Sequence, residues 1–175
     1  MDLRKSLLAE HSKAQCLKVV NWVGTSQPRF DELFALFLSH EYRVVQRSAW
    51  PLSYAVIAHP ELIRPHFSKL IRYLAKPGIH PAVKRNAMRL LQGIEIPRRF
   101  QGKIMSLCFG YVSDPNEAIA TKAFSLTVLE NLAAHYPEIL PELKTIIEDR
   151  WEFETPAFRS RGKKILKKAS IPSRK

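Results

Sequence analysis

One eight-residue phrase recurs along this chain and constrains its fold more than any other feature. It reads VQRSAWPL at 45–52, VKRNAMRL at 83–90 and IATKAFSL at 119–126, each with an alanine four positions after a β-branched residue and a leucine three beyond. Weaker copies lie at 10–17 and 158–165. The small residue therefore recurs at spacings of 35, 38, 36 and 39, at Ala14, Ala49, Ala87, Ala123 and Gly162. Units of this length, each too small to bury its own apolar face, indicate stacked helical hairpins.

Prolines mark the start of a second helix in each unit. Pro28, Pro60, Pro97 and Pro137 follow the register residue by 10 to 14 positions. Proline suits a first helical turn because its missing N–H would have no partner there. Apolar residues after each proline are spaced by three and four, and no stretch alternates with period two, so we expect no sheet. The pattern predicts nine helices, at 3–23, 28–39, 42–58, 60–75, 80–94, 97–112, 115–135, 137–149 and 156–169.

Composition places these helices in one core-forming domain. With 46% hydrophobic side chains among 175 residues, the chain can bury a substantial core. We predict a single repeat domain over residues 1–170, followed by a short basic tail at 171–175, with the register residues and the thiols of Cys16 and Cys108 buried. No apolar run approaches the roughly 18 to 20 residues of a membrane span, and the N-terminus lacks the apolar core of a secretion signal. We expect a cytoplasmic protein with no membrane contact.

The repeats, over roughly residues 10–170, resemble HEAT repeats of the armadillo-like superfamily. The segment DPNEAIATKAFSLTVLENLAAHYPEILPELKTIIE at 114–148 carries the resemblance best. The resemblance implies an all-α, right-handed α-α superhelix of about four and a half helical hairpins, with first helices on the convex side and second helices on the concave side. Pro51 fits the kink that first helices of this family often carry. One departure is that a basic residue follows the valine only at Lys84, whereas Gln46 and Ala120 take that place in other copies.

Sequence motifs give little support for an enzyme. There is no HExxH, Walker loop, G-x-S-x-G or G-x-G-x-x-G, and the six histidines are scattered, so we predict no metal and no cofactor. The fold leaves one enzymatic alternative: some bacterial alkylpurine DNA glycosylases use HEAT-like repeats to hold a damaged nucleotide against tryptophans beside a carboxylate. Trp151 next to Glu152 and Glu154 is the candidate, although that family's catalytic constellation finds no residue-by-residue match here.

Charge is concentrated at the C-terminal end. Residues 155–175 hold eight basic and no acidic side chains, which is +8 of the net +12. Such asymmetry suggests an interacting edge. The candidate polyanion-binding residues lie on both flanks of the last helix: Arg159, Arg161, Lys163, Lys164, Lys167 and Lys168. A second basic set is expected to line the concave groove: Lys69, Arg72, Arg99 and Lys103.

Three functions remain open at this stage. Acidic residues share the groove, and that mixture of signs favours a non-enzymatic scaffold that binds a protein or peptide partner. The polar last helix is also what the end of any solenoid needs, since it stops further stacking. Nucleic-acid binding through the basic last helix is the alternative, because lysine and arginine neutralise phosphates. A repair-type glycosylase is the third reading.

Overall fold

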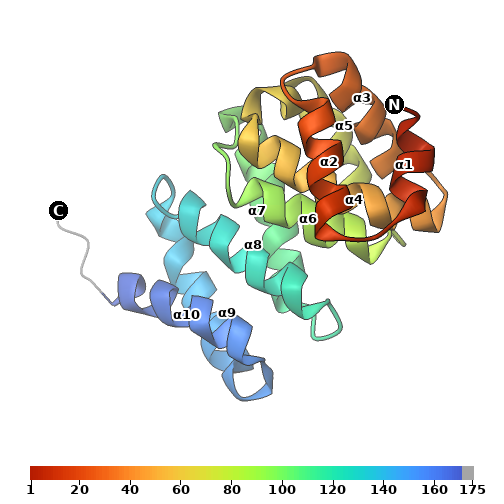
Figure 1. The fold of residues 1–175 in the computed structure, drawn as a ribbon. Coiled ribbons are helices and arrows are strands. Elements are labelled where there is room, and N and C mark those ends of the chain that lie inside the picture. Colours follow the sequence, from red (N-terminus) through yellow and green to blue (C-terminus); the bar gives the residue numbers. More distant parts are fainter. Residues whose placement is uncertain (171–175) are drawn as a thin grey trace. The chain divides into compact units, whose positions relative to one another are not determined.

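The computed structural model describes residues 1–170 and contains two compact units, the first spanning Met1–Ile96 and the second beginning at Pro97. Within the described residues all regular elements are helices and none is a strand (Figure 1). The all-α prediction is therefore confirmed. The single repeat domain predicted over 1–170 stays a prediction, and the basic tail predicted at 171–175 lies outside the described residues.

Six α-helices and one 3₁₀ helix form the first unit. They are α1 (Leu3–Ala9), α2 (Lys13–Val23), α3 (Gln27–Phe37), α4 (Tyr42–Ala58), η1 (Pro60–His66), α5 (Phe67–Leu74) and α6 (Pro81–Leu91). Helix α4 is central, because α1, α2, α3 and α6 all pack against it. Its buried face includes Ala49 and Leu52, and α3 adds Phe30, Phe34 and Phe37 to the same unit's core.

Four α-helices and two short 3₁₀ turns form the second unit. They are α7 (Arg98–Ser113), α8 (Ile119–Leu132), η2 (Pro137–Ile139), α9 (Leu140–Arg150), η3 (Trp151–Phe153) and α10 (Pro156–Ala169). Helix α8 packs against α7 and against α10, and the ribbon of α10 runs beside that of α8 (Figure 1). The core between them includes Ile104, Leu126, Leu129, Ile147 and Phe158, all fully buried.

Four of the five register residues occupy the buried positions that the repeat predicts. Ala49 and Ala87 are 0% exposed, Ala123 is 3% exposed and Gly162 is buried. The prediction is wrong for the first copy, where Ala14 is exposed and its partner Leu17 is 39% exposed. Helix α2 instead buries Cys16, Val19 and Val23, which are three and four residues apart and so share one face. That face lies nearly opposite Ala14 on the helix.

The predicted helix at 3–23 is wrong because the chain breaks between Ala9 and Lys13. Ser12 has an extended backbone, and its hydroxyl accepts a hydrogen bond from the Gln15 N–H at 3.1 Å, which starts a second helix. The Gln15 side chain then donates to the Ser6 hydroxyl at 2.7 Å. These bonds tie the start of α2 back to α1. A serine followed three residues later by glutamine is a known helix-start pattern, so the break was visible in the sequence.

Proline chemistry also shifts three predicted boundaries. The predicted helix at 60–75 begins as the 3₁₀ helix η1, because in an α-helix the Pro65 ring would clash with the carbonyl group four residues earlier. Pro115 does not start a helix: the Asp114 carboxylate accepts a hydrogen bond from the Asn116 N–H at 2.8 Å, and this turn delays α8 to Ile119. Likewise, the predicted helix at 137–149 is divided into η2 and α9.

Candidate binding surface of the C-terminal helix

Helix α10 is fixed in the second unit by one apolar stripe and a cap. Thr155 accepts a hydrogen bond from the Phe158 N–H at 3.5 Å, and Pro156 occupies the first turn. Phe158, Gly162 and Ile165 then face inward and are buried. Because one side of the helix is held in the core, its polar side chains are presented from a rigid base.

Gly162 sets how closely α10 approaches the end of α9. A Cβ atom added at this residue would lie 3.0 Å from Ile147 Cγ2 and 3.3 Å from Trp151 Cζ3. Any larger side chain would therefore push against both groups. The missing side chain brings the Trp151 indole against the surface of α10, where it lies among basic residues that follow it in the sequence.

One flank of α10 is largely occupied by contacts with α8. Arg161 donates from Nε to the Thr127 hydroxyl at 3.1 Å, and its guanidinium lies 5.7 Å from the centre of the Phe124 ring. Lys168 forms an ion pair with Glu130 at 2.7 Å. Lys164, on the same flank, is exposed and forms no ion pair within residues 1–170. Two of the three cations on this flank therefore contribute to docking the helix.

The opposite flank carries Arg159, Lys163 and Lys167. Arg159 donates from Nε to the Glu154 carbonyl oxygen at 3.0 Å, which fixes the direction of its guanidinium. Lys163 and Lys167 are exposed, and in the described part of the chain neither forms an ion pair. As far as residues 1–170 show, this flank is therefore a surface of positive charge without an acidic partner.

A shallow pocket lies on this flank of α10. It encloses about 450 Å³ and is lined by one side chain from η3 and four from α10: Trp151, Pro156, Arg159, Ser160 and Lys163. The α10 residues fall at helical spacing, so they share one face. The pocket thus combines an indole and a proline ring with a guanidinium, a hydroxyl and an ammonium group.

Sequence reasoning placed Arg159 and Lys163 in a basic surface but did not join Trp151 to it. Trp151 was instead considered together with Glu152 and Glu154. The signal that could have joined them is Gly162, because a glycine at a register position allows a bulky neighbour to lie directly on the helix.

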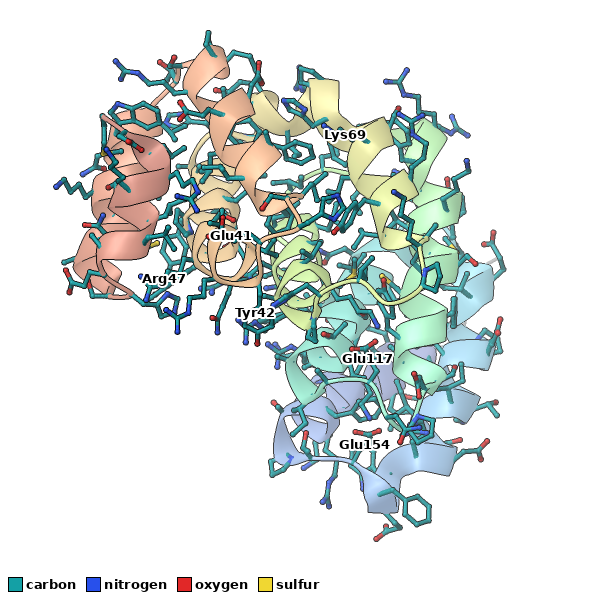
Figure 2. The ribbon with its side chains drawn as sticks, turned by 90° about the vertical axis from the view of Figure 1, so that its right-hand side faces the viewer. Glu41, Tyr42, Arg47, Lys69, Glu117 and Glu154 are labelled. Carbon is teal, nitrogen blue, oxygen red and sulfur yellow. The ribbon has the colours of Figure 1, made fainter. Side chains whose placement is uncertain are left out.

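The Glu154 carboxylate is turned into the protein, where two cations bind it (Figure 2). Its Oε1 accepts hydrogen bonds from Lys122 Nζ at 2.6 Å and from Arg150 Nη2 at 2.6 Å, and its side chain is 3% exposed. Burial disfavours the ionised form, but the hydrogen bonds and charges of Lys122 and Arg150 outweigh it and lower the pKa of Glu154. This carboxylate therefore anchors the connection before α10 and is not presented to the pocket.

The four residues predicted to line a concave groove fall in separate units. Lys69 and Arg72 are exposed on α5 of the first unit, and Arg99 and Lys103 are exposed on α7 of the second. Lys69 Nζ lies 5.9 Å from the centre of the Phe34 ring, and Arg99 lies 4.7 Å from the centre of the Phe100 ring. A common groove for all four remains a prediction.

No group of three or more His, Cys, Asp or Glu side chains within residues 1–170 is arranged to hold a metal ion. None of the described helices is both long and apolar enough to cross a membrane.

The comparisons with known proteins identify the repeat. A family model described as a HEAT repeat domain matches residues 3–169. Neither the curated proteins nor the solved structures compared with the chain gave a match. The family model covers nearly the whole chain and agrees with the paired helices and with the register residues buried in four copies. The chain belongs to the HEAT repeat domain family.

Proposed function

We propose that this protein is a non-enzymatic scaffold that binds an acidic protein or peptide partner through α10. The observation that carries this proposal is the charge of that helix: six basic and no acidic side chains lie on a helix whose apolar stripe is buried. Lys163, Lys164 and Lys167 are exposed without ion-pair partners among the described residues. A rigid cationic surface of this kind steers and orients a partner of opposite charge.

The chemistry of the titratable groups supports a scaffold over an enzyme. Burial raises the pKa of Cys16 to about 11 and that of Cys108 to about 12, so both thiols stay protonated near neutral pH and are poor nucleophiles. Glu154, the carboxylate first considered as a repair-type catalytic group, is engaged by Lys122 and Arg150. A repair glycosylase would require base release from alkylated DNA, which we expect to be absent.

The test compares two charge-reversal variants of the full chain as baits in a native lysate treated with nuclease. The first carries Lys163→Glu, Lys164→Glu and Lys167→Glu on α10. The second, a matched control with the same change in net charge, carries Lys69→Glu and Arg72→Glu on α5 and Lys76→Glu just after it. We expect proteins that bind the wild type to be retained by the α5 variant and lost from the α10 variant.

Any protein captured in this way is then purified, and its complex with the full chain is measured directly. A complex of defined stoichiometry that weakens by about tenfold or more with the α10 variant supports the proposal, because reversing several interfacial charges removes both attraction and orientation. Equal affinity of both variants would move the binding surface away from α10. Proteins that are captured from an untreated lysate but not from the nuclease-treated one would contradict a direct protein partner.

Nucleic acid is a second candidate because Arg159, Lys163 and Lys167 recur along one helix flank at spacings of four residues. Such spacing allows successive side chains to meet successive phosphates. This alternative predicts binding that depends steeply on salt. The protein-partner proposal predicts only weak, nonspecific binding of the same DNA.

A further inference from the structure

We infer that the pocket formed by Trp151, Pro156, Arg159, Ser160 and Lys163 binds one apolar side chain of an acidic peptide segment, while Arg159 and Lys163 bind the carboxylates beside it. The inference rests on the proposed function, because it specifies what kind of partner segment α10 receives. It also goes further, since a basic surface alone would accept any acidic chain without an apolar anchor.

The size and lining of the pocket favour a single anchoring side chain. Its volume of about 450 Å³ is near the lower end of the roughly 300–1,000 Å³ range of ligand pockets. Trp151 and Pro156 offer ring surfaces against which an apolar group can pack. An apolar side chain held in such a pocket often contributes most of the binding energy of an interface.

The charged side of the pocket is arranged to receive carboxylates. The bond from Arg159 Nε to the Glu154 carbonyl holds the guanidinium in place, and its two terminal nitrogens form no hydrogen bond within residues 1–170. A planar guanidinium with both terminal nitrogens available binds a carboxylate through two parallel hydrogen bonds. Lys163, one helical turn further along, adds a second cation without an internal partner.

The surroundings of Trp151 favour a peptide over a nucleic-acid strand. Asp149 and Glu152 flank Trp151 in the sequence and are both exposed. A phosphodiester chain carries a negative charge at every nucleotide, so it is repelled by acidic residues that neighbour Trp151 in the sequence. A peptide can place acidic residues on the α10 side and neutral or basic residues near Asp149 and Glu152. Charge complementarity on this surface therefore selects a chain of mixed sequence.

The pocket is formed before any ligand arrives. Trp151 is held against α10 by the close approach at Gly162, and the chain between them is fixed by the Lys122–Glu154–Arg150 cluster. A preformed pocket loses little conformational freedom on binding, which favours affinity for a short segment.

The experiment selects displayed random peptides of about 12 residues on the full chain and measures the enriched sequences by fluorescence anisotropy. Three variants distinguish the contribution of the apolar anchor to peptide affinity from the contribution of the charges. Ser160→Phe fills the pocket and keeps its charges, Lys163→Glu reverses a charge inside it, and Lys164→Glu reverses a charge on the opposite flank as the matched control. Circular dichroism and thermal melting verify that each variant folds.

We expect enriched peptides to share an apolar residue flanked by acidic ones. Ser160→Phe and Lys163→Glu should each weaken their binding by about tenfold, and Lys164→Glu by no more than about threefold. A peptide in which alanine replaces the anchor should bind the wild type as weakly as the original peptide binds Ser160→Phe.

Three outcomes would overturn the inference. The first is an empty selection or enriched peptides without acidic residues, and the second is equal loss of affinity in Lys163→Glu and Lys164→Glu. The third is tighter binding of single-stranded oligothymidylate than of the peptides, lost in the same two pocket variants, which would assign the pocket to nucleic acid. The second outcome leaves an acidic partner on α10 intact. A native partner complex that the α10 charge-reversal variant retains, although these peptides are lost as expected, would contradict the proposed function alone.

Discussion

At the scale of single residues, the second unit is organised around one absent side chain and one buried ion cluster. Gly162 allows Trp151 and Ile147 to lie against α10, and Glu154 joins Lys122 to Arg150. The glycine was recognisable from the repeat, because it replaces the register alanine of the other copies. The ion cluster was not, because Lys122 lies 32 residues from Glu154 in the sequence and both residue types are rarely buried.

Replacing Gly162 by alanine tests the close approach. A helix interior gains up to about 1 kcal/mol when alanine replaces glycine, but the new Cβ would lie 3.0 Å from Ile147 Cγ2 and crowd a fully buried side chain. We expect Gly162→Ala to lower the free energy of unfolding by about 1 kcal/mol in urea denaturation. Gly102→Ala on α7, which meets no atom within 4 Å, should raise it by about 0.5–1 kcal/mol. Stabilisation in both variants would show that α10 and α9 have room to separate.

The ion cluster predicts a large cost for Glu154→Gln. The substitution preserves shape but leaves Lys122, whose side chain is 5% exposed, without its counter-charge. Breaking a buried pair in this way typically costs about 3–5 kcal/mol, so we expect urea denaturation to show a loss of this order. Glu148→Gln is the control, because the Lys144–Glu148 pair spans 3.8 Å at the surface and should contribute less than about 1 kcal/mol.

The same carboxylate predicts an acid-sensitive stability. The folded protein lowers the pKa of Glu154 below its ordinary value of 4.5, so the unfolded chain binds this proton more readily. The contribution of Glu154 is therefore complete above pH 4.5 and is lost as the pH falls through the folded pKa. The wild type should lose stability relative to Glu154→Gln only in that acidic range. A constant difference between them at all pH values would contradict an ionised Glu154.

At the scale of helices, proline and small-residue patterns predict most of the elements, and capping decides the remainder. The register alanines identify α4, α6 and α8 correctly, because close packing admits only a small side chain there. They fail at Ala14, where the Ser12 cap begins a separate helix whose buried face includes Cys16. An apolar periodicity alone cannot place such a break, since leucines and valines continue on both sides of it.

The difference between correct and incorrect register positions can be measured. Ala87 is 0% exposed, so Ala87→Leu should overpack a helix contact and lower the free energy of unfolding by about 1–3 kcal/mol. Ala14 is exposed, and Ala14→Leu should change stability by less than about 0.5 kcal/mol. Denaturant titration of both variants provides the comparison. Equal effects would mean that burial does not distinguish the two alanines.

At the scale of the whole molecule, the sequence predicts the family and the location of charge, whereas the pocket requires tertiary structure. The match to the HEAT repeat domain over residues 3–169 agrees with the resemblance read from the repeated phrase. The pocket brings Trp151 from η3 to residues of α10, and no local pattern records that contact. Charge was easier to locate, because the net charge of the chain is +12 and helix α10 alone carries six basic and no acidic residues.

This concentration of charge makes a prediction about salt. If α10 neutralises four to six phosphates of duplex DNA, log affinity should fall with log salt at a slope of about −4 to −5, since each contact contributes about −0.9. If the surface instead receives an acidic peptide with an apolar anchor, its affinity should retain a component that high salt does not remove, because burial of the anchor is not screened. Fluorescence anisotropy of both ligands across a salt series measures the two slopes.

Lys163→Glu with Lys167→Glu should flatten whichever slope arises from α10, while the melting temperature stays nearly unchanged because both side chains are exposed. A steep slope for DNA together with peptide binding that vanishes at high salt would favour nucleic acid, because the peptide would then be held by charge alone.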